Sequence, residues 1–300
     1  MSRAERIAAV GFDPAERDRE AVTACNLCGA TRLVEAARRD RYGYGQPTLV
    51  CACCGLGMLS PRLTAAEYAR FYEDTYRPLV SAYHGRRIDA ETVQVDQRDY
   101  ADQLAAFLGA RLPNPVESLL DVGGSTGVVA GAVAERLGCS AAVLDPAPDE
   151  LEVAAAAGME TFAGFAEDFD PGDRRWQLVL LCQTIDHLLD VRTTLESLRR
   201  LTSEGGHLFV DVLDVEYAIR AKGGLDGAAK VDHPFYLTRT TGEAFLAAAG
   251  FEVVSERLSD DGHWGFLARA AEPVAHDAGA LRRHADGLLD LVWTSRARPA

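Results

Sequence analysis

Short apolar runs alternate with amphipathic segments of helical length between residues 117 and 270. The last two runs face each other across the connection SDDG at 259–262, which is typical of a hairpin. This pattern predicts an α/β fold: a Rossmann-like, doubly wound sheet of seven strands, the last two a hairpin, with helices on both faces. The predicted strands are 117–122, 140–145, 159–163, 176–182, 206–213, 251–258 and 263–270, and the helices between them are 126–138, 149–157, 190–202 and 240–249.

Three further helices are predicted outside this region. One spans 63–76, and a longer one spans 88–112, where Pro113 and Pro115 end it. The segment 77–87 between them is rich in aromatic residues and is expected to be irregular. The third helix is predicted at 277–291, near the C-terminus.

Composition and charge narrow the class of protein. Apolar residues make up 48% and charged residues 25% of the chain, as in ordinary globular proteins. No uncharged apolar run approaches the roughly 20 residues that span a bilayer, and the first residues lack the apolar core of a signal peptide. We therefore expect a cytoplasmic protein without a membrane span. The net charge of −14 disfavours a nucleic-acid partner, because such binding depends on Lys and Arg at phosphates.

Five of the seven cysteines fall within thirty residues. Cys25 and Cys28 form one CxxC pair, and Cys51 and Cys54 form another, with 22 residues between the pairs. Four thiolates in this arrangement fit a tetrahedral Zn²⁺ with no open position, which predicts a structural site. Cys53 is a spare thiol without the CxxC spacing. The alternatives are incidental thiols and an iron–sulfur or redox centre.

The stretch SLLDVGGSTG at 118–127 joins an apolar strand to a glycine-rich turn. A helix and a second strand follow, and that strand ends on Asp145. This order is typical of a nucleotide-binding βαβ unit. Gly123, Gly124 and Gly127 let the backbone approach a ligand closely, and the Asp145 carboxylate is suited to bind both ribose hydroxyls.

Asp121 bears on the choice of ligand, because it ends the first strand beside the glycines. A carboxylate here would repel the pyrophosphate of a dinucleotide, which binds at this turn. S-adenosylmethionine (SAM) has no phosphate but carries a sulfonium and an α-ammonium group, so Asp121 favours SAM.

These residues resemble the class I SAM-dependent methyltransferases over about 117–270. The family motif, acid-x-Gly-x-Gly-x-Gly, is matched at Asp121, Gly123 and Gly127, with Ser125 in place of the middle glycine. The resemblance implies that Asp145 binds ribose with Pro146 following it. It also implies adenine contacts from Glu167 and Asp168, and a cofactor contact from Gln183 in the stretch LVLLCQTIDHLLDV.

The N-terminal part is similar to a group of bacterial methyltransferases that carry a zinc module ahead of the catalytic fold, many of which modify sugars, glycans or secondary metabolites. Four parts are expected on this basis. They are a zinc-binding module (1–62), a helical linker or cap (63–115), a SAM-binding methyltransferase domain (116–271) and a C-terminal helical tail (272–300).

Two histidines are candidates for the catalytic base. His187 follows the fourth strand, and His233 follows the glycine-containing segment after the fifth, so both should lie at the carboxyl edge of the sheet, where ligands bind. A neutral imidazole can accept a proton from an acceptor group at physiological pH.

The sequence therefore predicts a SAM-dependent methyltransferase with a structural zinc, acting on a small molecule or glycan precursor. A zinc-ribbon RNA methyltransferase is the alternative that Arg38, Arg39 and Arg41 would serve. A non-catalytic SAM-binding or scaffold protein is a third reading. The oligomeric state is not predicted.

Overall fold

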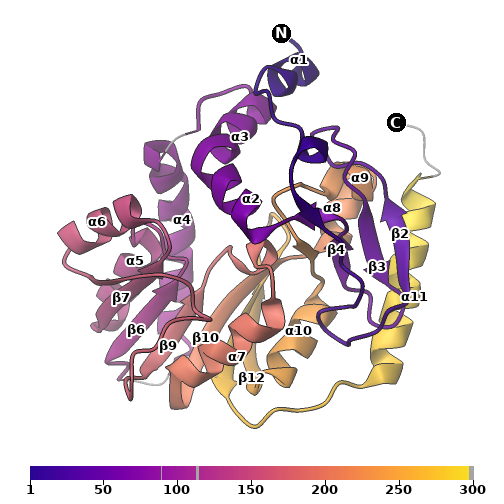
Figure 1. Ribbon diagram of the computed structural model, residues 1–300. Helices are drawn as coiled ribbons and strands as arrows, with labels where there is room; N and C mark the ends of the chain where they lie inside the picture. The colour runs from indigo at the N-terminus through magenta and orange to yellow at the C-terminus, as the bar shows by residue number, and fades with distance from the viewer. Residues whose placement is uncertain (89, 113–114, 297–300) are drawn as a thin grey trace.

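A seven-stranded mixed sheet forms the centre of the computed structural model, which describes residues 1–88, 90–112 and 115–296 (Figure 1). The strand order is β12-β13-β10-β9-β6-β7-β8; β13 runs antiparallel to both of its neighbours, and the strands from β10 to β8 are parallel. The predicted fold class, with its terminal hairpin, is confirmed. The strands are β6 (Ser118–Val122), β7 (Ser140–Asp145), β8 (Glu160–Ala163), β9 (Trp176–Leu181), β10 (Thr202–Leu213), β12 (Phe251–Leu258) and β13 (His263–Ala270).

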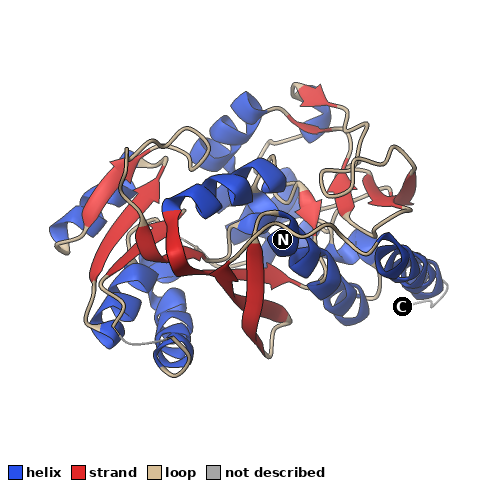
Figure 2. Cartoon of the chain, turned by 90° about the horizontal axis from the view of Figure 1, so that it is seen from below, coloured by secondary structure: helices blue, strands red, loops and turns tan. Residues whose placement is uncertain are grey.

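Helices cover both faces of this sheet (Figures 1 and 2). The alternation of side chains along β6 shows why: Leu119 belongs to the cluster with Val133, whereas the next residue, Leu120, belongs to the cluster with Leu195. All four side chains are buried, so each face has its own apolar core. The covering helices are α4 (Ala90–Gly109), α5 (Val128–Leu137) and α6 (Pro148–Ala156), and α7 (Val191–Leu201) and α10 (Arg239–Ala248).

A second, four-stranded sheet has the order β11-β4-β3-β2. Three of its strands come from the N-terminal part, but β11 follows β10 in the chain and pairs antiparallel with β4. Helix α11 contacts β2, β3 and α8 and runs along the outside of this sheet (Figure 1). The elements of this part and its surroundings include β1 (Arg19–Glu20), β2 (Leu33–Ala37), β3 (Thr48–Cys51), β4 (Gly57–Leu59), β5 (Arg62–Leu63), β11 (Phe235–Tyr236), α1 (Arg3–Ala8), η1 (Pro14–Glu16), α8 (Val215–Lys222), α9 (Leu225–Ala228) and α11 (Ala278–Arg296).

The expected irregular segment at 77–87 is largely helical, which corrects the prediction. Helix α2 (Ala65–Arg70) continues through a π-helical turn, η2 (Phe71–Thr75), into α3 (Tyr76–His84). Pro78, which has no N–H to donate, lies in the first turn of α3, directly after the π-helical turn that already interrupts the regular hydrogen-bond pattern. Leu79 is fully buried and anchors the helix. Pro113, predicted to end the preceding long helix, lies outside the described residues.

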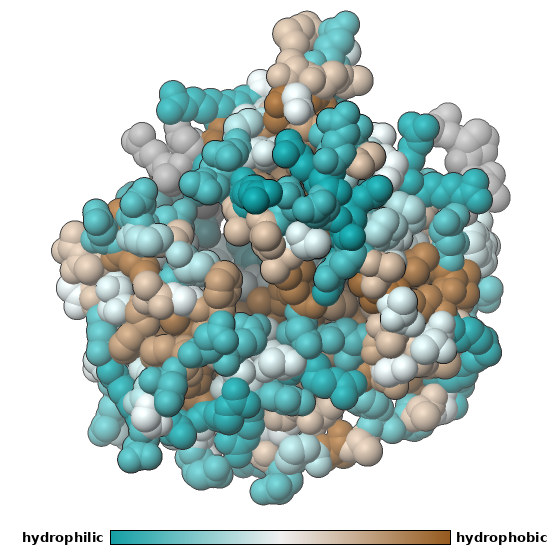
Figure 3. All heavy atoms as spheres, in the orientation of Figure 1, coloured by the Kyte–Doolittle hydropathy of each residue, from teal (hydrophilic) through white to brown (hydrophobic). Residues whose placement is uncertain are grey.

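Helices α2 and α3 lie over the carboxyl ends of the parallel strands (Figure 1). The space-filling view of the same face is hollowed between α2 and the side of the molecule that carries α5 and α6 (Figure 3). Among the described helices, none combines the length and the apolar character needed to cross a bilayer.

Candidate active site

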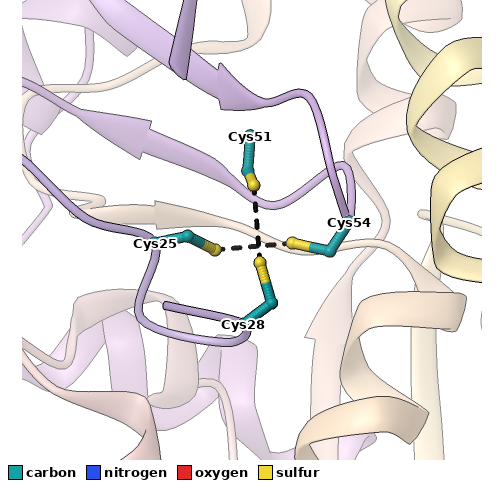
Figure 4. Close-up of side chains that lie close together, drawn as sticks. All are labelled: Cys25, Cys28, Cys51 and Cys54. Atoms are coloured by element: carbon teal, nitrogen blue, oxygen red, sulfur yellow. Dashed lines mark hydrogen bonds between the residues drawn. The ribbon is translucent and has the colours of Figure 1, made fainter. Parts of the chain in front are cut away.

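Four cysteine side chains converge on one point between β3, β4 and the loop that precedes β2 (Figure 4). The Sγ atoms of Cys25 and Cys54 are 3.4 Å apart, and those of Cys28 and Cys51 are 3.6 Å apart. All four sulfurs lie within 4.8 Å of one another, and none is in a disulfide. Cys53 is not a member of the group. The four predicted ligands are thus brought together in a set whose chemistry suits a tetrahedral metal.

Asp121 lies at the end of β6 and is buried without a partner. Neither of its carboxylate oxygens accepts a hydrogen bond from the described residues. Burial, together with the nearby charge of Asp145, raises the pKa of Asp121 to about 8. A Cβ at Gly124 would lie only 2.7 Å from Cγ of Asp121, so glycine is needed for the turn to pass this close. An uncompensated buried carboxyl beside a glycine turn is suited to receive a cationic ligand.

The turn uses left-handed backbone at three positions. Gly123 and Gly127 have φ angles of +71° and +77°, and Ser125, where the resembling family has glycine, has a φ of +51°. The N–H of Ser125 donates to the Asp145 carboxylate at 2.9 Å. Pro146 follows directly, so the loop and the tip of the second strand meet as the βαβ reading predicts.

The N-terminal helices reach this turn. Glu150, in the first turn of α6, accepts a hydrogen bond from the Ser125 hydroxyl. The same carboxylate accepts a bond from the Arg77 guanidinium of α3 at 3.3 Å. Through Glu150, hydrogen bonds therefore connect Arg77 of α3 to Ser125 in the glycine turn.

The other predicted cofactor residues occupy the neighbouring strand ends. Glu167 and Asp168 are exposed, and Glu167 accepts a hydrogen bond from the Thr194 hydroxyl on α7. Gln183 is exposed with a φ of +50°, and its N–H donates to the Asp211 carboxylate at 2.6 Å. These residues border the carboxyl edge, but no direct contact joins the two acids to Gln183.

The two candidate histidines meet at this edge, with ring centroids 4.5 Å apart. His187 belongs to a single helical turn, η3 (Ile185–His187), and His233 precedes β11. His233 is only 5% exposed and has a partner at each nitrogen. Its Nδ1 lies 2.6 Å from the Asp186 carboxylate, and its Nε2 lies 2.9 Å from Nζ of Lys230. Because an ammonium can only donate, Nε2 accepts and the ring proton is on Nδ1, facing Asp186.

His187 is held differently. Its Nδ1 lies 3.0 Å from the Asp232 carbonyl oxygen and 2.7 Å from the Tyr72 hydroxyl. The Tyr72 hydroxyl donates to the same carbonyl at 3.1 Å. Since a carbonyl only accepts, the His187 proton belongs on Nδ1, and Nε2 keeps its lone pair. No hydrogen bond to this Nε2 comes from the described residues.

Burial sets the charge state of this cluster. It lowers the pKa of His233 to about 4, so the ring is neutral at physiological pH. Burial also lowers the pKa of the Lys230 ammonium. Burial alone would raise the pKa of Asp186, but the contact with His233 Nδ1 and the nearby Lys230 ammonium hold that pKa below its usual range.

Asp186, His187 and His233 are close enough together to hold a metal ion. The hydrogen bonds argue against one: with Lys230 donating to Nε2, the Nδ1 atom that faces Asp186 bears a proton and offers no lone pair. We therefore assign no metal to this cluster.

Sequence reasoning missed Tyr72 and Lys230. Nothing in the sequence around Tyr72 indicates its contacts, because its partners lie more than a hundred residues away. Lys230 did offer a signal: it is one of only two lysines in the chain and stands three residues before His233.

Comparisons with known proteins agree with this geometry. A family model described as a methyltransferase domain matches residues 92–256, more than half of the chain. No curated protein matches the chain in sequence.

Solved structures are similar in fold at low sequence identity. A chain in the complex between the Haloferax volcanii Trm112 methyltransferase activator and a putative methyltransferase has a TM-score of 0.50 and 17% identity, covering 61% of this chain and 96% of that one. An O-methyltransferase family protein from Burkholderia thailandensis has a TM-score of 0.51 and 16% identity, covering 69% and 64%. The PH0226 protein from Pyrococcus horikoshii has a TM-score of 0.51 and 16% identity, and the match covers 58% of this chain and 91% of that one. The chain belongs to the methyltransferase domain family and is a SAM-dependent methyltransferase.

Proposed function

We propose that this enzyme methylates a small-molecule acceptor: a sugar, a glycan precursor or a secondary metabolite. The observation that carries the proposal is the pair of imidazoles at the carboxyl edge, covered by Tyr72 of the helical cap. This cluster adjoins the glycine turn, because a Cβ at Gly123 would lie 3.0 Å from the Thr184 side chain, which directly precedes η3. An enclosed edge of this kind suits a small acceptor.

The residues around the turn fit SAM, which supplies an electrophilic methyl group on its sulfonium. The unpartnered carboxyl of Asp121 would face the positive end of the ligand. Asp145, now bonded to the backbone N–H groups of Ser125 and Ala147, would hold the ribose hydroxyls. The backbone of Gly123, Gly124, Ser125 and Gly127 would line the ligand, with Pro146 and Gln183 at its border and Glu167 and Asp168 toward the adenine.

We propose His187 as the base that removes a proton from the acceptor. Its Nε2 has a lone pair and no hydrogen-bond partner among the described residues, whereas both nitrogens of His233 are engaged. His233 would support this step from 4.5 Å away and keep Asp186 oriented. The sequence put His233 first, and these contacts favour the reverse order.

Alanine substitutions test this order by measuring the release of S-adenosylhomocysteine from SAM across a panel of hydroxylated acceptors. His187→Ala should lower turnover by about 10²–10⁴-fold with little change in S-adenosylhomocysteine affinity, the pattern of lost proton transfer. His233→Ala should lower turnover less. His276→Ala is the matched control, because this histidine lies in the connection between β13 and α11. Normal turnover in the His187/His233 double variant would refute the assignment.

We also propose a structural Zn²⁺ at Cys25, Cys28, Cys51 and Cys54. The support is the convergence of four sulfurs within 4.8 Å of one another, three of the residues being buried. Such a site stabilises a small module whose own core is modest.

The RNA methyltransferase reading gains no support from its arginines. Arg41 is half-buried, with its guanidinium over the Tyr83 ring at 4.4 Å, so it is withdrawn from the proposed basic surface. Arg38, paired with Glu35, and Arg39 are exposed, but two arginines are few phosphate contacts for a chain with a net charge of −14.

A further inference from the structure

The residues between the first two cysteines are hydrogen-bonded to the start of the helix that follows His187. Asn26, between Cys25 and Cys28, donates from its side-chain amide to the Asp190 carboxylate at 2.8 Å. Its amide oxygen accepts from the Arg192 N–H at 3.2 Å, and its carbonyl oxygen accepts from Arg192 Nε at 3.1 Å. The Arg192 guanidinium also donates to the Leu27 carbonyl.

The contact between Asn26 and Asp190 lies close to the candidate active site. Asp190 is the N-cap of α7, where its side chain accepts from the N–H of Thr193, and it stands only three residues after His187. Arg62, from β5, adds a bond to the intervening Leu189 carbonyl at 2.8 Å. The segment between the histidine and α7 is therefore tied down by the N-terminal part of the chain.

The second cysteine pair is tied to the segment that carries His233. Strand β4 follows Cys54 and pairs with β11, placing Gly57 opposite Tyr236. The Leu59 N–H donates to the Pro234 carbonyl at 3.0 Å, directly beside His233. Packing is close here, since a Cβ at Gly57 would lie 2.9 Å from Cβ of Tyr236.

We propose that the cysteine module, residues 22–62, is the device that sets the separation and orientation of His187 and His233. One cysteine pair holds each histidine segment, and a metal joining the pairs fixes both segments relative to each other. Asn26 and Arg192 are positioning residues for His187, and Gly57 serves the same purpose for His233. The inference rests on the proposed catalytic function of the histidines and adds that the metal site controls their geometry.

The first test uses imidazole nitrogen chemical shifts in the full-length zinc-loaded enzyme labelled with ¹⁵N-histidine, which report the protonated nitrogen of each ring. Arg192→Ala and Asn26→Ala should move the His187 signals toward the average of the two tautomers and leave the His233 signals in place. Zinc content and S-adenosylhomocysteine affinity should change less than about twofold, because the cofactor turn is not part of the contact. Arg200→Ala is the matched control on α7, since the hydrogen bond that Arg200 makes within the described ranges is to Ser197 of its own helix.

The second test addresses the other histidine. Gly57→Ala should move the His233 signals, whereas Gly45→Ala, in the same module but with open space around its Cβ position, should move neither set. Removing zinc with a chelator should move both sets at once. With an acceptor in hand, Arg192→Ala should also lower kcat by about 10–100-fold at nearly constant KM for SAM, as expected when reacting groups are misplaced.

Unchanged signals of both histidines after zinc removal would overturn the inference, whatever the activity. The failure of the proposed function looks different. If His187→Ala and His233→Ala retain full turnover while the signals still respond to Arg192, Gly57 and zinc, the module positions these rings but the rings do not carry the chemistry.

Discussion

Protonation of Asp121 should control how tightly the enzyme binds S-adenosylhomocysteine between pH 5.5 and 7.0. In the free protein its carboxyl accepts no hydrogen bond from the part of the chain that the structure describes, and burial raises its pKa to about 8, so the neutral form dominates over this range. The ammonium group of the ligand favours the ionised form. Binding must therefore release a proton, and affinity should rise with pH.

The size of the effect follows from the same pKa. Where a site must lose one proton to bind, each pH unit below the free pKa costs about tenfold in affinity, or about 1.4 kcal/mol. Across these 1.5 units the affinity should rise by up to about 30-fold, or about 2 kcal/mol. The ligand's own α-amino group, with a pKa near 8, stays protonated and adds little slope.

Calorimetry measures both quantities. Titrations in buffers of different ionisation enthalpy should show release of close to one proton at pH 6, and Kd should fall as pH rises. Asp121→Asn is the matched variant, because it keeps the shape of the side chain but cannot ionise, and it should remove most of the slope. Burial also raises the pKa of Asp145, so a smaller slope should remain at the acid end. A Kd that is flat from pH 5.5 to 7.0 in the native enzyme, or an equal slope in Asp121→Asn, would show that Asp121 does not face the ligand's charge.

Two further outcomes are expected. Elemental analysis should find one zinc per chain, which is lost in Cys25→Ser and Cys54→Ser but kept in Cys53→Ser. If zinc is instead kept in Cys54→Ser and lost in Cys53→Ser, then Cys53 rather than Cys54 is the ligand. Asp145→Ala should weaken S-adenosylhomocysteine binding by about 1–3 kcal/mol through lost charge-assisted hydrogen bonds, and tight NAD binding without any response to SAM products would contradict the cofactor assignment.

The sheet could be predicted because its determinants are local. Leu119 and Leu120 face opposite helical layers, and each parallel strand is a short run of such residues between turn signals. Gly123 and Gly127 likewise predict the sharp turn from local sequence, and both adopt positive φ. The metal-binding group could be predicted for the same reason, since the two cysteines of each CxxC pair lie in one local turn.

Elements that depend on distant partners were not found. Strand β11 has two residues and exists only because β4 lies beside it. Helix α8 (Val215–Lys222) was missed although Asp214 caps it, because its apolar residues face a cluster completed by α11 and β2. Tyr72 and Lys230 acquire a role only through residues brought to the same edge by the fold.

The pairing of β4 with β11 crosses the boundary expected at residue 62 between the zinc-binding module and the rest of the chain. A strand from after His233 completes the sheet that begins with the cysteine pairs, and the core around Cys51, Cys54 and Met58 is continuous with Phe235 and Leu237. The cysteine module and the methyltransferase sheet thus share one apolar core. Loss of the proposed zinc would disturb that core, which includes Phe235, two residues after His233, before it disturbed the glycine turn. Cofactor binding and proton transfer should therefore separate when the metal is removed, with binding the more robust of the two.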